Sequence, residues 1–186
     1  MTFRWYFYLL YPFTALNTLV ALLQFLVYRP VKWRWRAGCV EMIAGTFERN
    51  GEQVTRIWGR PAAQSLGCPV IYFANERDIE DEGLGVHERV HTYQGVVINA
   101  QATCLLWPLL FTVWFDMPGH LWWPLLALGP AGFGIVYGGH FLWEWMISGF
   151  GAWQVAYRRI WAERIAHRIQ GEFNEGKRPG AWGGEA

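Results

Sequence analysis

The chain has 186 residues, which is enough for one domain of ordinary size and gives no reason to expect a second. Hydrophobic residues make up 53% of it and charged residues only 17%, a balance that favours lipid contact over a fully water-solvated surface. No basic patch indicates a nucleic-acid partner. The three cysteines are odd in number and lack CxxC spacing, so a disulfide framework is not expected.

Three uncharged stretches are long enough to cross a hydrocarbon core about 30 Å thick as helices. They are residues 5–28, 96–115 and 121–143, and Pro and Gly within 116–120 favour a turn between the last two. The first is interpreted as a retained membrane helix, since no small-residue cleavage site follows it. We therefore expect a mainly α-helical membrane protein in which residues 1–186 form a single membrane domain surrounded by lipids.

The distribution of basic residues predicts the orientation of these spans. Four Lys or Arg lie in residues 29–36 and six in the tail after the third span, whereas the turn between the second and third spans has none. The positive-inside rule then places the N-terminus outside, and residues 29–95 and the tail in the cytoplasm. Most tryptophans near the expected boundaries are interpreted as interfacial anchors. They are Trp5, Trp33, Trp35, Trp114, Trp122, Trp123, Trp143 and Trp145.

The segment 29–95 is expected to form a small cytoplasmic cap of short strands. Residues 39–47 and 53–58 flank an Asn-Gly pair at 50–51, which favours the positive φ angles of a hairpin turn. Residues 69–74 are predicted to form a third short strand.

Two helices complete the expected cytoplasmic part. Asn75 or Asp78 is predicted to cap a helix that continues past residue 86 into the second span, because no strong breaker lies before residue 106. A C-terminal helix is expected at residues 150–174.

A short motif on the first of these helices indicates metal chemistry. His87 and His91 are four positions apart, so on a helix they share one face and can bind the same Zn²⁺ ion. Glu88 lies beside them, where a carboxylate can accept a proton from water during attack on a carbonyl group. An amphipathic helix with two exposed histidines and a solvated glutamate is the alternative interpretation.

A peptidase-type zinc site also needs a third protein ligand and an open position for water. Glu163 and His167 are four apart on the expected C-terminal helix, and Glu163 is the preferred third ligand. A second pair, His140 and Glu144, lies near the cytoplasmic end of the third span. Glu144 competes with Glu163 as a ligand, or the pair simply forms a hydrogen bond within the helix bundle.

These residues carry a resemblance to a known family. Residues 87–94 (HERVHTYQ) follow a short strand and merge into membrane helices, and Tyr157-Arg158 and Trp-Ala-Glu163-Arg-Ile-Ala come later. This pattern resembles membrane-embedded gluzincin-type metallopeptidases, and in particular small bacterial membrane proteins with a HExxHxxQ motif, over roughly residues 66–170. The resemblance implies that His87, His91 and Glu163 bind zinc, that Glu88 is the general base and that the protein lies in a bacterial cytoplasmic membrane.

One position departs from the family pattern. Many gluzincins place an aspartate four residues after the third ligand, where it supports a zinc-bound histidine, and this chain has His167 there. Loss of such a partner typically costs about 10- to 100-fold in metal affinity or activity. Gln94, one turn beyond His91, is expected to support the site without binding the metal.

Two functions from different classes follow from these observations. The first is a membrane-bound zinc metallopeptidase acting on a peptide or protein substrate, with an exposed strand edge that holds the chain to be cleaved. The second is a non-catalytic structural or accessory subunit of a larger membrane complex, with a structural or vestigial metal site.

Overall fold

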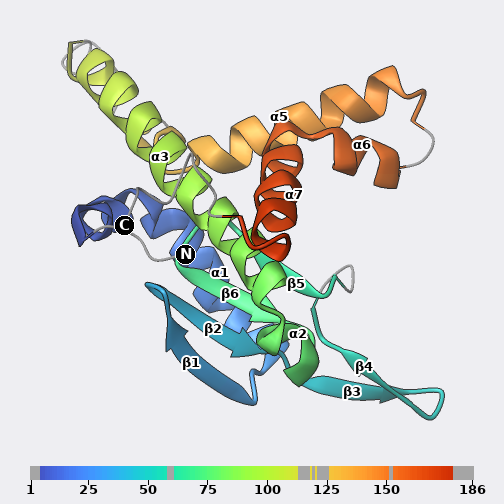
Figure 1. Ribbon diagram of the computed structural model, residues 1–186. Coiled ribbons are helices and arrows are strands. Elements are labelled where there is room, and N and C mark those ends of the chain that lie inside the picture. Colours follow the sequence, from blue (N-terminus) through green and yellow to red (C-terminus); the bar gives the residue numbers. More distant parts are fainter. Residues whose placement is uncertain are drawn as a thin grey trace.

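The computed structural model of the protein describes residues 5–57, 61–112, 118, 120, 126–150 and 153–177. Its elements, in chain order, are η1 (Trp5–Thr14), α1 (Ala15–Tyr28), β1 (Lys32–Arg36), β2 (Cys39–Ile43), β3 (Thr46–Arg49), β4 (Glu52–Thr55), β5 (Ala63–Ser65), β6 (Val70–Phe73), α2 (Glu76–Glu80), α3 (Glu82–Thr112), α5 (Gly132–Ile147), α6 (Trp153–Arg159) and α7 (Trp161–Asn174) (Figure 1). The described part is mostly helical, with one small mixed sheet and one separate hairpin.

The sheet has four strands in the order β1-β2-β6-β5. Strand β2 runs parallel to β6, while β1 and β5 lie antiparallel at the two edges. The expected hairpin is present as the pair β3–β4, and Asn50 and Gly51 in its turn both have positive φ angles. The stretch expected as one strand at 39–47 is instead divided between β2 and β3.

Helices cover both faces of the four-stranded sheet. Alternate residues of β6 point to opposite sides. On one side, Tyr72 packs with Ala21 and Tyr28 of α1. On the other, Ile71 and Phe73 join a cluster that includes Ile79 of α2 and Val96 of α3.

Helix α1 is attached to the sheet layer over much of its length. Asn17 donates a hydrogen bond to the carbonyl of Leu66, and the Tyr72 hydroxyl donates one to the carbonyl of Ala21. At the end of the helix, the amide of Gly45 donates to the carbonyl of Tyr28. One side of α1 is thus held by protein, whereas Leu19, Leu22, Leu23 and Leu26 are exposed on it.

The long helix α3 connects the sheet layer to the other helices. Its first half lies between the sheet and α7, which packs on it through Val86, Val90, Ala166 and Ile169. Farther along, the side chain of Asn99 accepts a hydrogen bond from the amide of Phe133 at the start of α5. In Figure 1 the last turns of α3 extend beyond the rest of the described chain.

Two helical stretches in the described chain, Tyr8–Tyr28 and Glu82–Thr112, are long and apolar enough to cross a membrane. The second contains the histidine motif in its buried first half, and its exposed second half carries Leu105, Leu109 and Phe111. The end of the expected second span (113–115), most of the turn that follows it and residues 121–125 lie outside the described residues, as do Trp114, Trp122 and Trp123.

Helix ends differ from expectation at two places. Asn75 caps α2 as expected, its side chain accepting a hydrogen bond from the Asp78 amide. However, α2 ends at Glu80, and Asp81 has extended backbone angles, so the motif lies on a separate helix, α3. The expected C-terminal helix is likewise divided, because Ile160 has extended angles between α6 and α7.

Candidate metal centre

Two histidines from α3 and one glutamate from α7 come together in the interior. The Nε2 atoms of His87 and His91 are 3.2 Å apart. His87 Nε2 lies 3.3 Å from Glu163 Oε2, and His91 Nε2 lies 3.2 Å from Glu163 Oε1. All three side chains are buried, and each offers one ligand atom within 4.8 Å of the others. In the part of the chain that the structure describes, this is the group that can hold a metal ion.

Local structure explains why these side chains meet. The four-residue spacing places His87 and His91 on one face of α3, about one turn apart. Glu163 lies in the first turn of α7, and the packing of α7 on α3 directs its carboxylate towards both imidazoles. Side chains more than seventy residues apart in sequence thus form the site.

The two imidazoles and the carboxylate, one oxygen of which makes no hydrogen bond in the described chain, fit a divalent transition metal. Glu163 Oε2 is buried and makes no hydrogen bond in the described chain, although His87 lies nearby. Burial raises the pKa of this carboxyl group, but the neighbouring His87, His91 and Tyr137 stabilise its ionised form and together hold the pKa well below its ordinary value. An ionised carboxylate beside two imidazoles is a set of ligands that zinc binds in catalytic sites.

Gln94 supports the second histidine. Its Oε1 lies 3.0 Å from Nδ1 of His91, and its Nε2 donates a hydrogen bond of 3.2 Å to the carbonyl of Ala162 on α7. If His91 carries its proton on Nδ1, it donates to Gln94 and leaves Nε2 free for a metal. Gln94 therefore orients His91 and fastens α3 to the residue before Glu163.

The first histidine has no comparable partner. Nδ1 of His87 is buried and forms no hydrogen bond to any described residue. His167 lies against it instead, with ring centroids 4.6 Å apart and planes inclined by 59°. Burial, and the proximity of His87, lower the pKa of His167. His167 thus packs against His87 without bonding it as an aspartate in the family pattern would.

Glu88 lies beside the ligand group but is not part of it. Its carboxyl group is buried and is close enough to interact electrostatically with His87, His91 and Glu163, and the backbone of Ser65 on β5 favours its ionised form. Strand β5 therefore reaches the site next to Glu88.

His140 and Glu144 occupy a different place. Their side chains pair with each other on α5 at 3.4 Å, and Nδ1 of His140 accepts a hydrogen bond from the amide of Trp161 at the start of α7. Glu144 does not belong to the group that contains the two motif histidines. The pair helps to join α5 to α7.

Two tyrosines at the site were not predicted. The hydroxyl of Tyr137, on α5, donates a 2.6 Å hydrogen bond to Glu163 Oε1. Tyr157, on α6, lies close enough to Glu163 and Tyr137 to interact with both. Tyr157 is part of the sequence resemblance, but without an assigned role. Tyr137 lies in an apolar stretch, where no local spacing relates it to the histidines.

This geometry defines a class of site: a buried group of two histidines and one carboxylate that can hold a metal ion, on two packed helices, one of which also packs against a small mixed sheet. Comparison of the chain with protein-family models, with curated proteins and with solved structures gives no significant match. The functional assignment therefore depends on the site itself.

Proposed function

We propose that the protein is a membrane-bound zinc metallopeptidase, with His87, His91 and Glu163 as ligands of Zn²⁺ and Glu88 as general base. The observation that carries this proposal is the convergence of three buried ligand atoms from α3 and α7, with a second acidic side chain, Glu88, beside them and outside the group. A bound Zn²⁺ ion would supply Lewis-acid chemistry, since it polarises a carbonyl group and makes water a better nucleophile at neutral pH.

Glu88 has the position that a general base needs. It is adjacent to the ligand group, and its carboxylate can accept a proton from attacking water and later give it to a leaving amine. The backbone of Ser65 lies beside this carboxylate and favours its ionised form.

A peptide substrate is proposed to bind along the outer edge of β5. In the pairing with β6, the amide of Ala74 donates to the carbonyl of Ala62, so Ala62 and Gln64 direct their backbone groups towards β6. Ala63 and Ser65 then direct theirs away from the sheet. An extended peptide can add to this edge by main-chain hydrogen bonds and bring a carbonyl group near Glu88.

The same proposal extends to location. We propose that the helices Tyr8–Tyr28 and Glu82–Thr112 anchor the protein in a bacterial cytoplasmic membrane. The third span expected at 121–143 stays a prediction, because its first five residues lie outside the described part and α5 begins only at Gly132. The Lys and Arg residues in 29–36 and in the tail support a cytoplasmic site, with the N-terminus outside.

Substitution of Glu88 tests the enzymatic part of the proposal. Glu88→Gln keeps the shape of the side chain but cannot accept a proton, so peptide hydrolysis should fall by about 10²- to 10⁴-fold while bound zinc is retained. Glu172→Gln, on the exposed side of α7, is the matched control and should leave hydrolysis unchanged. Full hydrolytic activity in Glu88→Gln would exclude Glu88 as the base.

One observation favours the second candidate function, an accessory subunit of a larger membrane complex with a structural metal site. Nδ1 of His87 has no hydrogen-bond partner among the described residues. Such a partner is needed less in a structural metal site than in one that catalyses a reaction. This function is supported if Glu88→Gln and His91→Ala both retain full function in cells and the protein co-purifies stoichiometrically with a membrane complex.

A further inference from the structure

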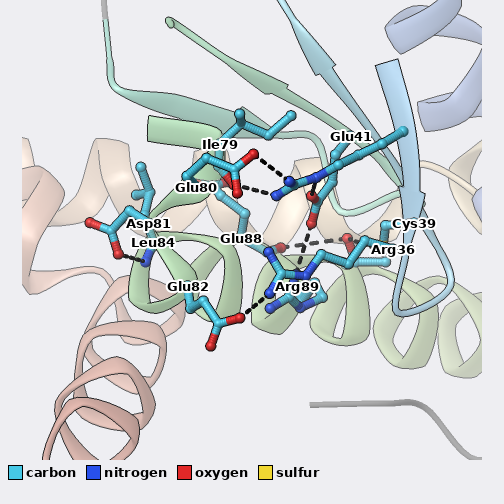
Figure 2. A network of polar contacts seen from close by, with 12 residues as sticks. Arg36, Cys39, Glu41, Ile79, Glu80, Asp81, Glu82, Leu84, Glu88 and Arg89 are labelled. Atoms are coloured by element: carbon cyan, nitrogen blue, oxygen red, sulfur yellow. Dashed lines mark hydrogen bonds and ion pairs between the residues drawn. The ribbon is translucent and has the colours of Figure 1, made fainter. Parts of the chain in front are cut away.

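A network of charged side chains lies behind the motif helix. Glu41 of β2 accepts a hydrogen bond of 2.8 Å from Arg89 Nη1 on Oε1, and another of 2.8 Å from Arg34 Nε on Oε2 (Figure 2). Glu41 and Arg89 are buried, with 0% and 2% of their surfaces exposed. One buried carboxylate thus joins a strand residue to a residue inside the histidine motif.

The network continues to the neighbouring helix α2. Nη1 of Arg34 lies 2.7 Å from Glu80 Oε1, and its Nη2 donates to the carbonyl of Ile79 in the last turn of α2. Glu41 is therefore held from one side by an arginine that is itself fixed at the edge of the sheet. The position of the Glu41 carboxylate relative to the sheet is thus fixed by Arg34, independently of its bond to Arg89.

Arg89 lies on the back of the metal-binding face. It is two positions after His87 and two before His91, which at 3.6 residues per turn places it about 200° around the helix from each. Gly85, one turn earlier, leaves room for its guanidinium group, since a Cβ at Gly85 would lie 3.2 Å from Arg89 Nη1. A rotation or shift of α3 that displaced the histidines would therefore break the bond to Glu41.

Stability alone does not account for such a pair. Buried ion pairs are often replaced by apolar side chains with little loss, because desolvation offsets their attraction. Here Arg89 Nε is also buried and has no hydrogen-bond partner in the described chain, which costs stability. Unlike apolar contacts, a hydrogen bond to a fixed carboxylate is directional. It forms only when α3 has one rotation about its axis and one position along that axis.

We propose that Glu41 is a positioning residue for the metal centre, which acts through Arg89 to fix the rotation of α3 so that His87 and His91 face Glu163. This inference assumes the metal site of the proposed function. It adds a residue from the sheet, forty-six positions before the first ligand, to the set on which metal binding depends.

Cobalt binding to the full-length protein in detergent tests the proposal, because Co²⁺ reports ligand geometry in its visible absorption. Glu41→Met leaves Arg89 without a carboxylate and should lower the thermal unfolding temperature. The double variant Glu41→Met/Arg89→Met should recover most of that temperature, because the buried charge pair is gone and the partly exposed Arg34 keeps its bond to Glu80. It should nevertheless bind Co²⁺ about tenfold more weakly than the wild type, with altered absorption bands.

A pair that joins the neighbouring strand β1 to α2 gives the control. Lys32 and Glu76 form an exposed ion pair between β1 and α2 that makes no contact with the network's carboxylate. The variant Lys32→Met/Glu76→Met should keep wild-type Co²⁺ affinity and spectrum. A stable Glu41→Met/Arg89→Met variant with wild-type affinity and spectrum would overturn the positioning role and leave the metal site intact.

A conservative variant decides the matter if the double variant does not fold. Glu41→Asp keeps both charges but draws the carboxylate back by one methylene group, so it should weaken Co²⁺ binding severalfold in a folded protein. Unchanged affinity in that variant would also overturn the inference. Absence of Co²⁺ and Zn²⁺ binding in the wild type is a different result, because it removes the proposed function together with the inference.

Discussion

The hydroxyl of Tyr137 connects helix α5 to the candidate ligand Glu163. Its hydrogen bond to Glu163 Oε1 is short, and the ring also packs near His91. Such a partner restricts the carboxylate to one rotamer and so lowers the cost of ordering it around a metal. Tyr137 thus contributes to the site without being a ligand.

Replacement of Tyr137 by phenylalanine should therefore weaken zinc binding by about tenfold while the protein remains folded. Competition with a chelating dye measures the affinity. Tyr72→Phe is the control: it removes a similar buried hydrogen bond, to the carbonyl of Ala21, but far from the ligands. Loss of stability in both variants with unchanged zinc affinity in Tyr137→Phe would show that the hydroxyl serves packing alone.

A single substitution at His167 should strengthen zinc binding. Aspartate at this position, one turn after Glu163, can accept a hydrogen bond from Nδ1 of His87, which now has no partner among the described residues. His167→Asp should tighten zinc binding by about tenfold, and His167→Ala should not. Equal or weaker binding by the aspartate variant would mean that His87 is oriented in another way.

At the scale of elements, the loop between β5 and β6 is held against α3 at one point of backbone contact. A Cβ on Gly95 would lie only 2.0 Å from the carbonyl oxygen of Gly67, and Gly67 has a positive φ angle. This close approach keeps β5 beside the motif helix, where Ser65 reaches Glu88. The glycine at 95 is therefore part of the geometry of the site.

Gly95→Ala should destabilise the protein by about 2 kcal/mol or more, because the loop must move away from the helix. Gly171→Ala, in the last turn of α7 with no heavy atom within 4 Å of the added Cβ, should be neutral or stabilising by up to about 1 kcal/mol. Thermal unfolding of both variants compares them directly. Equal stability of Gly95→Ala and the wild type would rule out the close contact.

Local signals predicted some of these elements and not others. The Asn-Gly turn at 50–51 and the cap at Asn75 depend on side chains within a few residues, and both are present. Strand β1 was missed because its basic residues indicated a membrane boundary. In the structure Lys32, Arg34 and Arg36 all pair with acidic residues on α2 or at the start of α3.

The candidate site was likewise predicted only in part from sequence. The spacing of His87 and His91 places them on one helical face, so their proximity follows from sequence alone. The choice of Glu163 over Glu144 required the packing of α7 on α3, and Tyr137 and Glu41 reach the site only through tertiary contacts. Sequence periodicity contains no information about such long-range contacts.

At the scale of the whole molecule, the positive-inside rule predicts that the hairpin β3–β4 and the end of α7 lie on the same side of the membrane. Cysteines introduced at Gln53 and Glu175, both exposed, should react with a membrane-impermeant reagent from the same side. A cysteine at His120 should react from the other side. The native exposed Cys104 must first be replaced by serine, whereas Cys39 and Cys68 are buried. Labelling of positions 53 and 175 from opposite sides would contradict the proposed topology.

The proposed metal centre joins the motif helix α3 to the C-terminal helix α7, so metal content is the measurement that tests the central claim most directly. Elemental analysis of purified protein should find one zinc ion per chain in the wild type and in Glu88→Gln, and almost none in His91→Ala or Glu163→Ala. A wild-type protein without zinc, or zinc fully retained in Glu163→Ala, would contradict the assignment of His87, His91 and Glu163 as its ligands.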